Sequence, residues 1–223
     1  MTANTAAQTL EAYAHWAPQY PPVAHNPLMR AEQNAMLEHW PEVAGRRALD
    51  LACGTGRYAN LLAAAHAAEV VAVDFCAPML AQVAAARRVC ASMMQLPFGS
   101  GIFDVVMSGL ALGHTPDLGA WMSEAARVLA KGGTLLYSDF HPAAAQMGLT
   151  RSFSDRKDRT WTVPHHSHDL QSQRDAAAAA GLTIDVMHEI RVGAELREPF
   201  ADSHRFYEKW NGLPIVLVVR ARK

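Results

Sequence analysis

A glycine-containing turn between a short apolar strand and a helix constrains this chain more than any other feature. Residues 47–51 read Arg-Ala-Leu-Asp-Leu, which is typical of a buried strand, and residues 52–56 read Ala-Cys-Gly-Thr-Gly. Glycine allows a tight turn and lets the backbone approach a ligand that a Cβ would block. A helix is predicted to begin at Arg57. This order of elements is typical of the first unit of a ligand-binding α/β sheet.

The same rhythm of strands and helices continues to about residue 140. Further strands are predicted at residues 69–73, 89–92, 103–108 and 134–138, with helices at 57–66, 78–88 and 118–130. This alternation predicts a parallel sheet with helices on both faces. Two helices are predicted ahead of it, at residues 6–16 and 27–40. Residues 141–168 are less regular, and a helix at 169–180 precedes two strands, 182–192 and 214–221, that should form an antiparallel edge.

Length and charge favour a single-domain protein and disfavour nucleic-acid-binding, membrane-spanning and secreted proteins. The chain has 223 residues, which suits one domain. Its net charge of −1 and pI of about 6.8 do not favour a nucleic acid partner. No stretch approaches the roughly 20 apolar residues of a membrane span, and the N-terminus lacks the pattern of a signal peptide, so a cytoplasmic protein is expected. Three scattered cysteines are expected to be reduced thiols.

An acidic residue, Asp74, closes the second strand of this sheet. At this place a carboxylate accepts both hydroxyls of a ribose. The structural alternative is an N-cap for a helix that begins near Pro78. The third glycine of a pyrophosphate-binding G-x-G-x-x-G loop is missing, because Ala59 and Asn60 follow Gly56. A nicotinamide dehydrogenase is therefore disfavoured.

In sequence the chain resembles the class I S-adenosylmethionine-dependent methyltransferases that act on small molecules, of the methyltransferase type 11 kind. The segments that carry the resemblance are 49–56, 73–74, 96–98, 103–106 and 126–133. It implies S-adenosyl-L-methionine as cofactor and a doubly wound, Rossmann-like sheet of seven mostly parallel strands with an antiparallel last strand. A single domain is expected, with a helical lid at 1–45, a cofactor-binding core at 46–140, a substrate-side insertion at 141–168 and a C-terminal helix and strands at 169–223.

The resemblance also assigns the cofactor contacts. Asp50 is expected near the amino end of the methionine, Asp74 on the ribose, and Leu110 beside the methionine part. The remaining expected contacts are Ala52, Gly54 and Gly56 in the loop, and Phe75, Ser92 and Met93 around the adenine. Two of these residues depart from the family pattern. Ala52 replaces the first loop glycine, and Ser92 stands where many relatives have an aspartate.

The methyl acceptor is expected beyond the carboxyl ends of the strands, where open α/β sheets bind ligands. Methyl transfer from a sulfonium chiefly requires alignment, and a base is needed only if the nucleophile must lose a proton. His141, after the fifth strand, is the candidate general base, and a purely structural histidine is the alternative. The candidate acceptor contacts are Tyr13, Trp16, Tyr20, His114, Arg151 and His165.

Three of these assignments have simpler alternatives. The aromatic residues Tyr13, Trp16 and Tyr20 either form a lid over the cofactor or pack against helices at the sheet edge. A basic cluster either holds an acidic substrate or is a solvated surface; it comprises Arg151, Arg156, Lys157 and Arg159. Residues 165–168 read His-His-Ser-His, with no cysteine or pair of carboxylates nearby. This pattern is too weak to indicate a metal, and no metal site is expected.

The leading hypothesis is therefore an enzyme that methylates a small molecule, free or bound to a carrier, on oxygen, nitrogen or a carboxylate. A more specific alternative is an enzyme that resembles the malonyl carrier-protein methyltransferase of biotin synthesis. A non-catalytic protein that binds S-adenosylmethionine is the alternative from another class. The sequence specifies neither the acceptor nor the oligomeric state.

Overall fold

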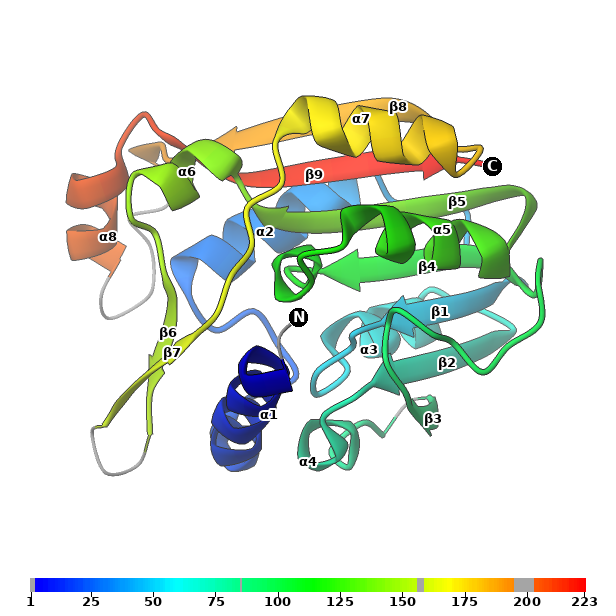
Figure 1. The fold of residues 1–223 in the computed structure, drawn as a ribbon, viewed down its shortest axis with the longest axis horizontal. Coiled ribbons are helices and arrows are strands. Elements are labelled where there is room, and N and C mark those ends of the chain that lie inside the picture. The colour runs from blue at the N-terminus through cyan, green and yellow to red at the C-terminus, as the bar shows by residue number, and fades with distance from the viewer. Residues whose placement is uncertain (1–2, 85, 156–158, 195–202) are drawn as a thin grey trace.

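The computed structural model describes residues 3–84, 86–155, 159–194 and 203–223, which build a seven-stranded sheet flanked by helices (Figure 1). The strand order is β3-β2-β1-β4-β5-β9-β8. The strands are β1 (Arg47–Leu51), β2 (Glu69–Asp74), β3 (Arg87–Cys90), β4 (Phe103–Gly109), β5 (Leu129–Phe140), β8 (Thr183–Arg191) and β9 (Pro214–Arg222). The first five are parallel, and β9 runs antiparallel between β5 and β8. The predicted doubly wound fold is confirmed.

Helices cover both faces of this sheet, as predicted. One face carries α2 (Pro27–Glu38) and α3 (Arg57–Ala64), and the other carries α5 (Leu118–Val128) and α7 (Leu170–Ala179). Strand β1 shows why both faces are apolar: Ala48 packs with the first pair of helices, and Leu49 and Leu51 pack with the second. None of the described helices is long and apolar enough to cross a membrane.

The remaining elements gather around one end of the sheet. They are α1 (Ala3–Trp16), η1 (Ala17–Gln19), α4 (Ala77–Leu80), η2 (Leu112–His114), α6 (Pro142–Gln146), α8 (Ser203–Trp210) and the hairpin β6 (Arg151–Ser154) and β7 (Thr160–Val163). The hairpin packs on α1 through a small apolar cluster of Ala12, Phe153 and Val163. The rings of Trp16 and Phe153 are stacked, with centroids 4.1 Å apart.

Two predicted elements were wrong in extent. The helix predicted at 78–88 ends at Leu80, although good helix formers continue beyond it. Tertiary structure overrides propensity there, because β3 begins at Arg87 to pair with β2, and the Gln82 side chain hydrogen-bonds the carbonyl of Ala17. The segment 141–168, expected to be irregular, contains α6 and the β6–β7 hairpin.

Candidate functional site

A cavity of about 540 Å³ lies beyond the carboxyl ends of β1, β2 and β4. The strand ends supply its floor, and α1, Tyr20 and the start of α2 contribute to its walls. This is the place where open α/β sheets bind ligands. The predicted residues that line it are Tyr13, Trp16, Tyr20, Asp50, Ala52, Gly54, Asp74, Phe75, Ser92, Met93, Leu110, His114 and Arg151.

The loop after β1 has an unusual backbone. Ala52, Gly54 and Gly56 all have positive φ angles, of 56°, 55° and 87°. The left-handed conformation costs a residue with a Cβ roughly 1 kcal/mol, so Ala52 is strained. A Cβ at Gly54 would meet no atom within 4 Å, because that side faces the cavity. At Gly56 a Cβ would lie 3.0 Å from the Val83 methyl carbons, so this glycine serves packing and is not among the lining residues.

Asp74 ties this loop to the end of β2. Its Oδ2 accepts a hydrogen bond from the backbone N–H of Gly54 at 2.8 Å, and its Oδ1 accepts one from Cys76, also at 2.8 Å. Burial raises the pKa of this carboxyl, against the opposing effect of these backbone donors. The N-cap of α4 is Cys76, so Asp74 does not take the alternative capping role. Each carboxylate oxygen keeps a lone pair that a ribose hydroxyl can use.

Asp50 lies at the other side of the loop, on β1. Its Oδ2 accepts a hydrogen bond from the backbone N–H of Ala59, at the start of α3, with a length of 2.7 Å. Burial raises the pKa of Asp50 to about 7, well above the ordinary value for aspartate. A cationic ligand group beside it would favour its ionised form.

A buried polar cluster that the sequence did not reveal joins α2 to α3. Nη1 of Arg57 lies 2.7 Å from Oε2 of Glu32. The hydroxyls of Tyr58 and Ser138 both donate to Oε1 of Glu32, at 2.6 Å each. Arg57 and Tyr58 also line the cavity. The position of Arg57 directly after Gly56 could have indicated that it lies at the cavity. Nothing in the helical pattern of 27–40 indicates that Glu32 is buried.

Arg151, at the start of the β6–β7 hairpin, forms a second polar centre. Its Nη1 donates to the carbonyl oxygen of Leu110 at 2.7 Å, and its Nη2 donates to Oδ1 of Asp139 at 2.9 Å. The guanidinium stacks over the Phe140 ring, 4.5 Å from its centroid. Its Nε is buried and has no hydrogen-bond partner within the described part of the chain. Arg151 thus carries a cationic donor in the cavity wall.

Three aromatic residues of the N-terminal segment lie in the cavity wall near Arg151. The Tyr13 hydroxyl lies 2.9 Å from Nε2 of His114, and Tyr13, Trp16 and Tyr20 all line the cavity. Burial lowers the pKa of His114 well below its ordinary value, so its imidazole is neutral at pH 7. The three rings also pack against Cys76 and Met79 at helix α4, as the packing alternative predicted. A lid over the cofactor stays a prediction.

Two predicted histidines lie outside the cavity lining. His141 caps α6: its Nδ1 accepts from the backbone N–H of Ala143 at 3.2 Å, and its Nε2 lies 3.5 Å from Oε1 of Glu189. Pro142 at the first helical position places it there. His165 packs its ring against Phe140. This arrangement gives no support to a general base at His141.

The two described members of the predicted basic cluster have different surroundings in the structure. Arg151 is buried at the cavity, whereas Arg159 is exposed and pairs with Asp155 at 2.9 Å. Arg156 and Lys157 lie outside the described residues. Only Arg151 of the described members can therefore contact a ligand in this cavity.

Comparison with known proteins supports a single family. A family model described as a methyltransferase domain matches residues 49–137. A malonyl-(acyl-carrier protein) O-methyltransferase of Enterobacter lignolyticus is 34% identical over 196 residues, which cover 86% of this chain and 73% of the relative. A demethylmenaquinone methyltransferase of Thermus thermophilus is 41% identical over 110 residues, covering 45% of this chain and 50% of the relative.

A solved structure shares the fold over most of this chain. The crystal structure of an S-adenosylmethionine-dependent methyltransferase from Mesorhizobium loti superposes with a TM-score of 0.71. The match covers 86% of this chain and 98% of the neighbour, at 22% sequence identity. The two chains therefore share the same overall fold.

Proposed function

Because the chain belongs to the class I S-adenosylmethionine-dependent methyltransferases, we propose that it methylates a carboxylate oxygen of a small acid, free or bound to a carrier. The family establishes the cofactor, and the acceptor is the new element of this proposal. The similar malonyl-(acyl-carrier protein) O-methyltransferase of Enterobacter lignolyticus supports an acidic acceptor. The enzyme and cofactor assignments argue against a protein that only binds S-adenosylmethionine.

The residues around the β1 loop fit this cofactor. The open space beside Gly54 admits a close ligand, the Asp74 carboxylate stands at the end of β2 for a ribose, and Asp50 is placed for an ammonium group. When bound, the cofactor supplies an electrophilic methyl group on a sulfonium. Of the nine cofactor residues that we assign, only Gly56 acts without lining the cavity.

The observation that carries the acceptor proposal is the buried guanidinium of Arg151. Each of its two terminal nitrogens has one N–H beyond its bond to Leu110 or Asp139. Charge-assisted bonds from such N–H groups to a carboxylate are stronger than neutral ones. The Tyr13 hydroxyl adjoins Arg151 and supplies a second donor at the same place. Both residues line the cavity, so an anion held there would share the cavity with the cofactor.

A carboxylate acceptor needs little more than alignment. It is ionised at pH 7, so the protein would have no proton to remove from the acceptor oxygen before it received a methyl group. Arg151 and Tyr13 orient the acceptor oxygen, and the rings of Trp16 and Tyr20 exclude water from the cavity. The absence of a histidine base from this scheme agrees with the capping role of His141.

A hydroxyl acceptor is the second candidate, because one observation favours it. The neutral imidazole of His114 bonds the Tyr13 hydroxyl inside the cavity and can accept a proton there. The two candidates differ in their need for a base.

An acceptor panel with methyl-labelled cofactor distinguishes the two candidates. It should contain a malonyl thioester of a carrier protein, free dicarboxylic acids, a phenol and a reduced quinone. We expect label in a base-labile methyl ester, with a rate at saturating cofactor that is flat between about pH 6 and pH 9. Labelling of the phenol or quinol alone, with a loss of about a hundredfold in His114→Gln, would replace the carboxylate proposal with the second candidate.

A further inference from the structure

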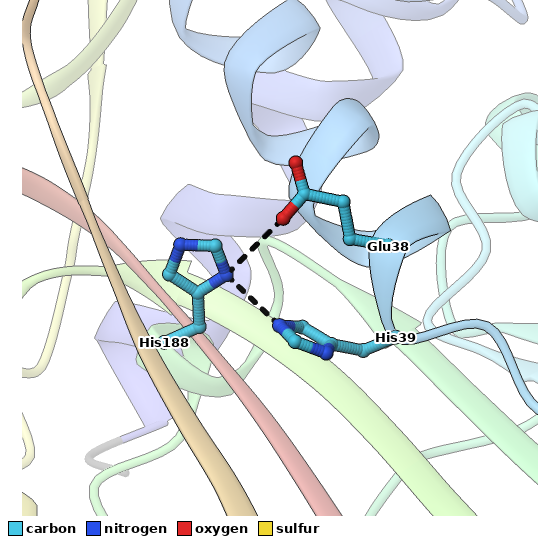
Figure 2. A group of neighbouring side chains, drawn as sticks. All are labelled: Glu38, His39 and His188. Atoms are coloured by element: carbon cyan, nitrogen blue, oxygen red, sulfur yellow. Dashed lines mark hydrogen bonds and ion pairs between the residues drawn. The ribbon is translucent and has the colours of Figure 1, made fainter.

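A group of three ligating side chains lies outside the cavity, where the end of α2 meets strand β8. Figure 2 shows Glu38 and His39 at the end of the helix and His188 on the strand, all pointing toward one another. Glu38 is exposed, and the two histidines are half-buried. None of the three lines the cavity, so methyl transfer leaves this group unexplained.

We propose that Glu38, His39 and His188 bind a Zn²⁺ ion that joins the end of α2 to strand β8. Two imidazoles and one carboxylate form a ligand set that zinc uses in proteins, with water in the fourth position. No metal was expected from the sequence, where only residues 165–168 were considered as ligands. Glu38 and His39 meet His188 only in the folded sheet.

The distances between the ligand atoms fit this ion. Nε2 of His39 lies 2.9 Å from Nδ1 of His188, and Oε2 of Glu38 lies 3.7 Å from the same nitrogen. All three ligand atoms lie within 4.8 Å of one another. Zinc bonds of about 2.0–2.1 Å in a tetrahedron place neighbouring ligand atoms about 3.3 Å apart. Small rotations of the exposed Glu38 carboxylate and the two rings are enough to reach this spacing.

The nearby positive charges are paired with a carboxylate, so they do not oppose a bound cation. On β9, which pairs with β8, Arg220 is held by two bonds of 2.9 and 3.0 Å to the Asp185 carboxylate, which also binds Arg222. Glu38 brings a negative charge to the group. Without an ion, the group is held by one hydrogen bond between two rings and a long contact to Glu38.

The elements that carry the ligands suggest what the ion would do. Helix α2 begins at Pro27, in the cavity wall, and ends at Glu38. An ion at this end would link α2 to β8, while the first turn of α2 would stay available to contact ligands in the cavity. Because the ion would bind the folded chain and not the unfolded one with this geometry, it would raise the melting temperature.

Calorimetric titration of ZnCl₂ into the tag-free, EDTA-treated full chain tests the proposal. We expect one equivalent to bind, and His188→Gln or His39→Gln to weaken binding about tenfold or more. Glu38→Gln should weaken it as well. His66→Asn is the matched control, because His66 is exposed, tolerates Asn at its positive φ of 61°, and belongs to no such ligand group within the described ranges.

Thermal melting gives an independent readout. Zinc should raise the melting temperature of the native chain and of His66→Asn, but not that of His188→Gln. Equal zinc affinities for the native chain and for His188→Gln would overturn the proposal. So would a native chain that takes up no zinc in the titration. Either result concerns this site alone, because none of its three side chains lines the cavity.

Discussion

The two sides of the cavity are built in different ways. The cofactor side consists of the ends of β1 and β2 and the loops that follow them, so most of its residues lie within one stretch, 50–75. The proposed acceptor side combines α1, the η2 turn and the first residue of the β6–β7 hairpin, which are far apart in sequence. A site built from one stretch of sequence can be predicted from that stretch. A site built from distant segments can be identified only once the folded structure shows how they pack.

The structure reflects this difference residue by residue. Eight of the nine residues assigned to the cofactor line the cavity, since parallel strands bring their carboxyl ends to one edge. On the acceptor side, Arg151 looked in sequence like three other basic residues nearby. Only the packing of the hairpin on α1 distinguishes it, by burying it against Phe140 and Asp139.

Two further elements show where sequence reasoning stops. His141 does follow the fifth strand, but Pro142 begins a helix there and makes His141 its cap. Glu32 sits in a helix where its neighbours predict no polar contact, yet its carboxylate is completely buried by Arg57, Tyr58 and Ser138. In both cases the decisive partner comes from another element.

The largest expected effect concerns the buried ion pair that joins α2 to α3. Glu32→Gln leaves the Arg57 guanidinium buried without its counter-charge, so the free energy of unfolding should fall by about 3–5 kcal/mol. Urea denaturation measures this loss, and the exposed Glu11→Gln on α1 is the control, with an expected change under about 0.5 kcal/mol. A similar small change in both variants would mean that the pair does not tie α2 to the core.

A pH dependence of cofactor affinity would sharpen the description of the cofactor side. The pKa of Asp50 is raised to about 7 in the ligand-free chain, so the carboxyl is protonated below this pH and ionised above it. A cationic ligand group favours the ionised form, and affinity should fall up to about tenfold from pH 8 to pH 6. Calorimetry across this range should give a flatter curve for Asp50→Asn; parallel curves would remove Asp50 from the cation site.

The smallest expected effect tests the strain in the β1 loop. Ala52→Gly relieves a positive φ of 56° and should raise the free energy of unfolding by about 1 kcal/mol. Ala63→Gly, inside α3, is the matched control and should lower it by about 0.5–1 kcal/mol. Opposite signs in urea denaturation support the strain, while a loss of stability in both variants would argue against it.

The most direct test of a cavity divided into a cofactor side and an acceptor side crosses two variants with two measurements. Cofactor dissociation constants and the acceptor kcat/KM at saturating cofactor are measured for Asp74→Asn and Arg151→Lys, with Arg159→Lys as the exposed control. Asp74→Asn should weaken the cofactor by about 1.5–3 kcal/mol. Arg151→Lys should leave cofactor affinity within about twofold and lower the acceptor kcat/KM about tenfold to a hundredfold, because lysine keeps the charge but not the fork of donors. An Arg151→Lys enzyme that loses cofactor affinity as severely as Asp74→Asn, with its acceptor kcat/KM unchanged, would contradict the division.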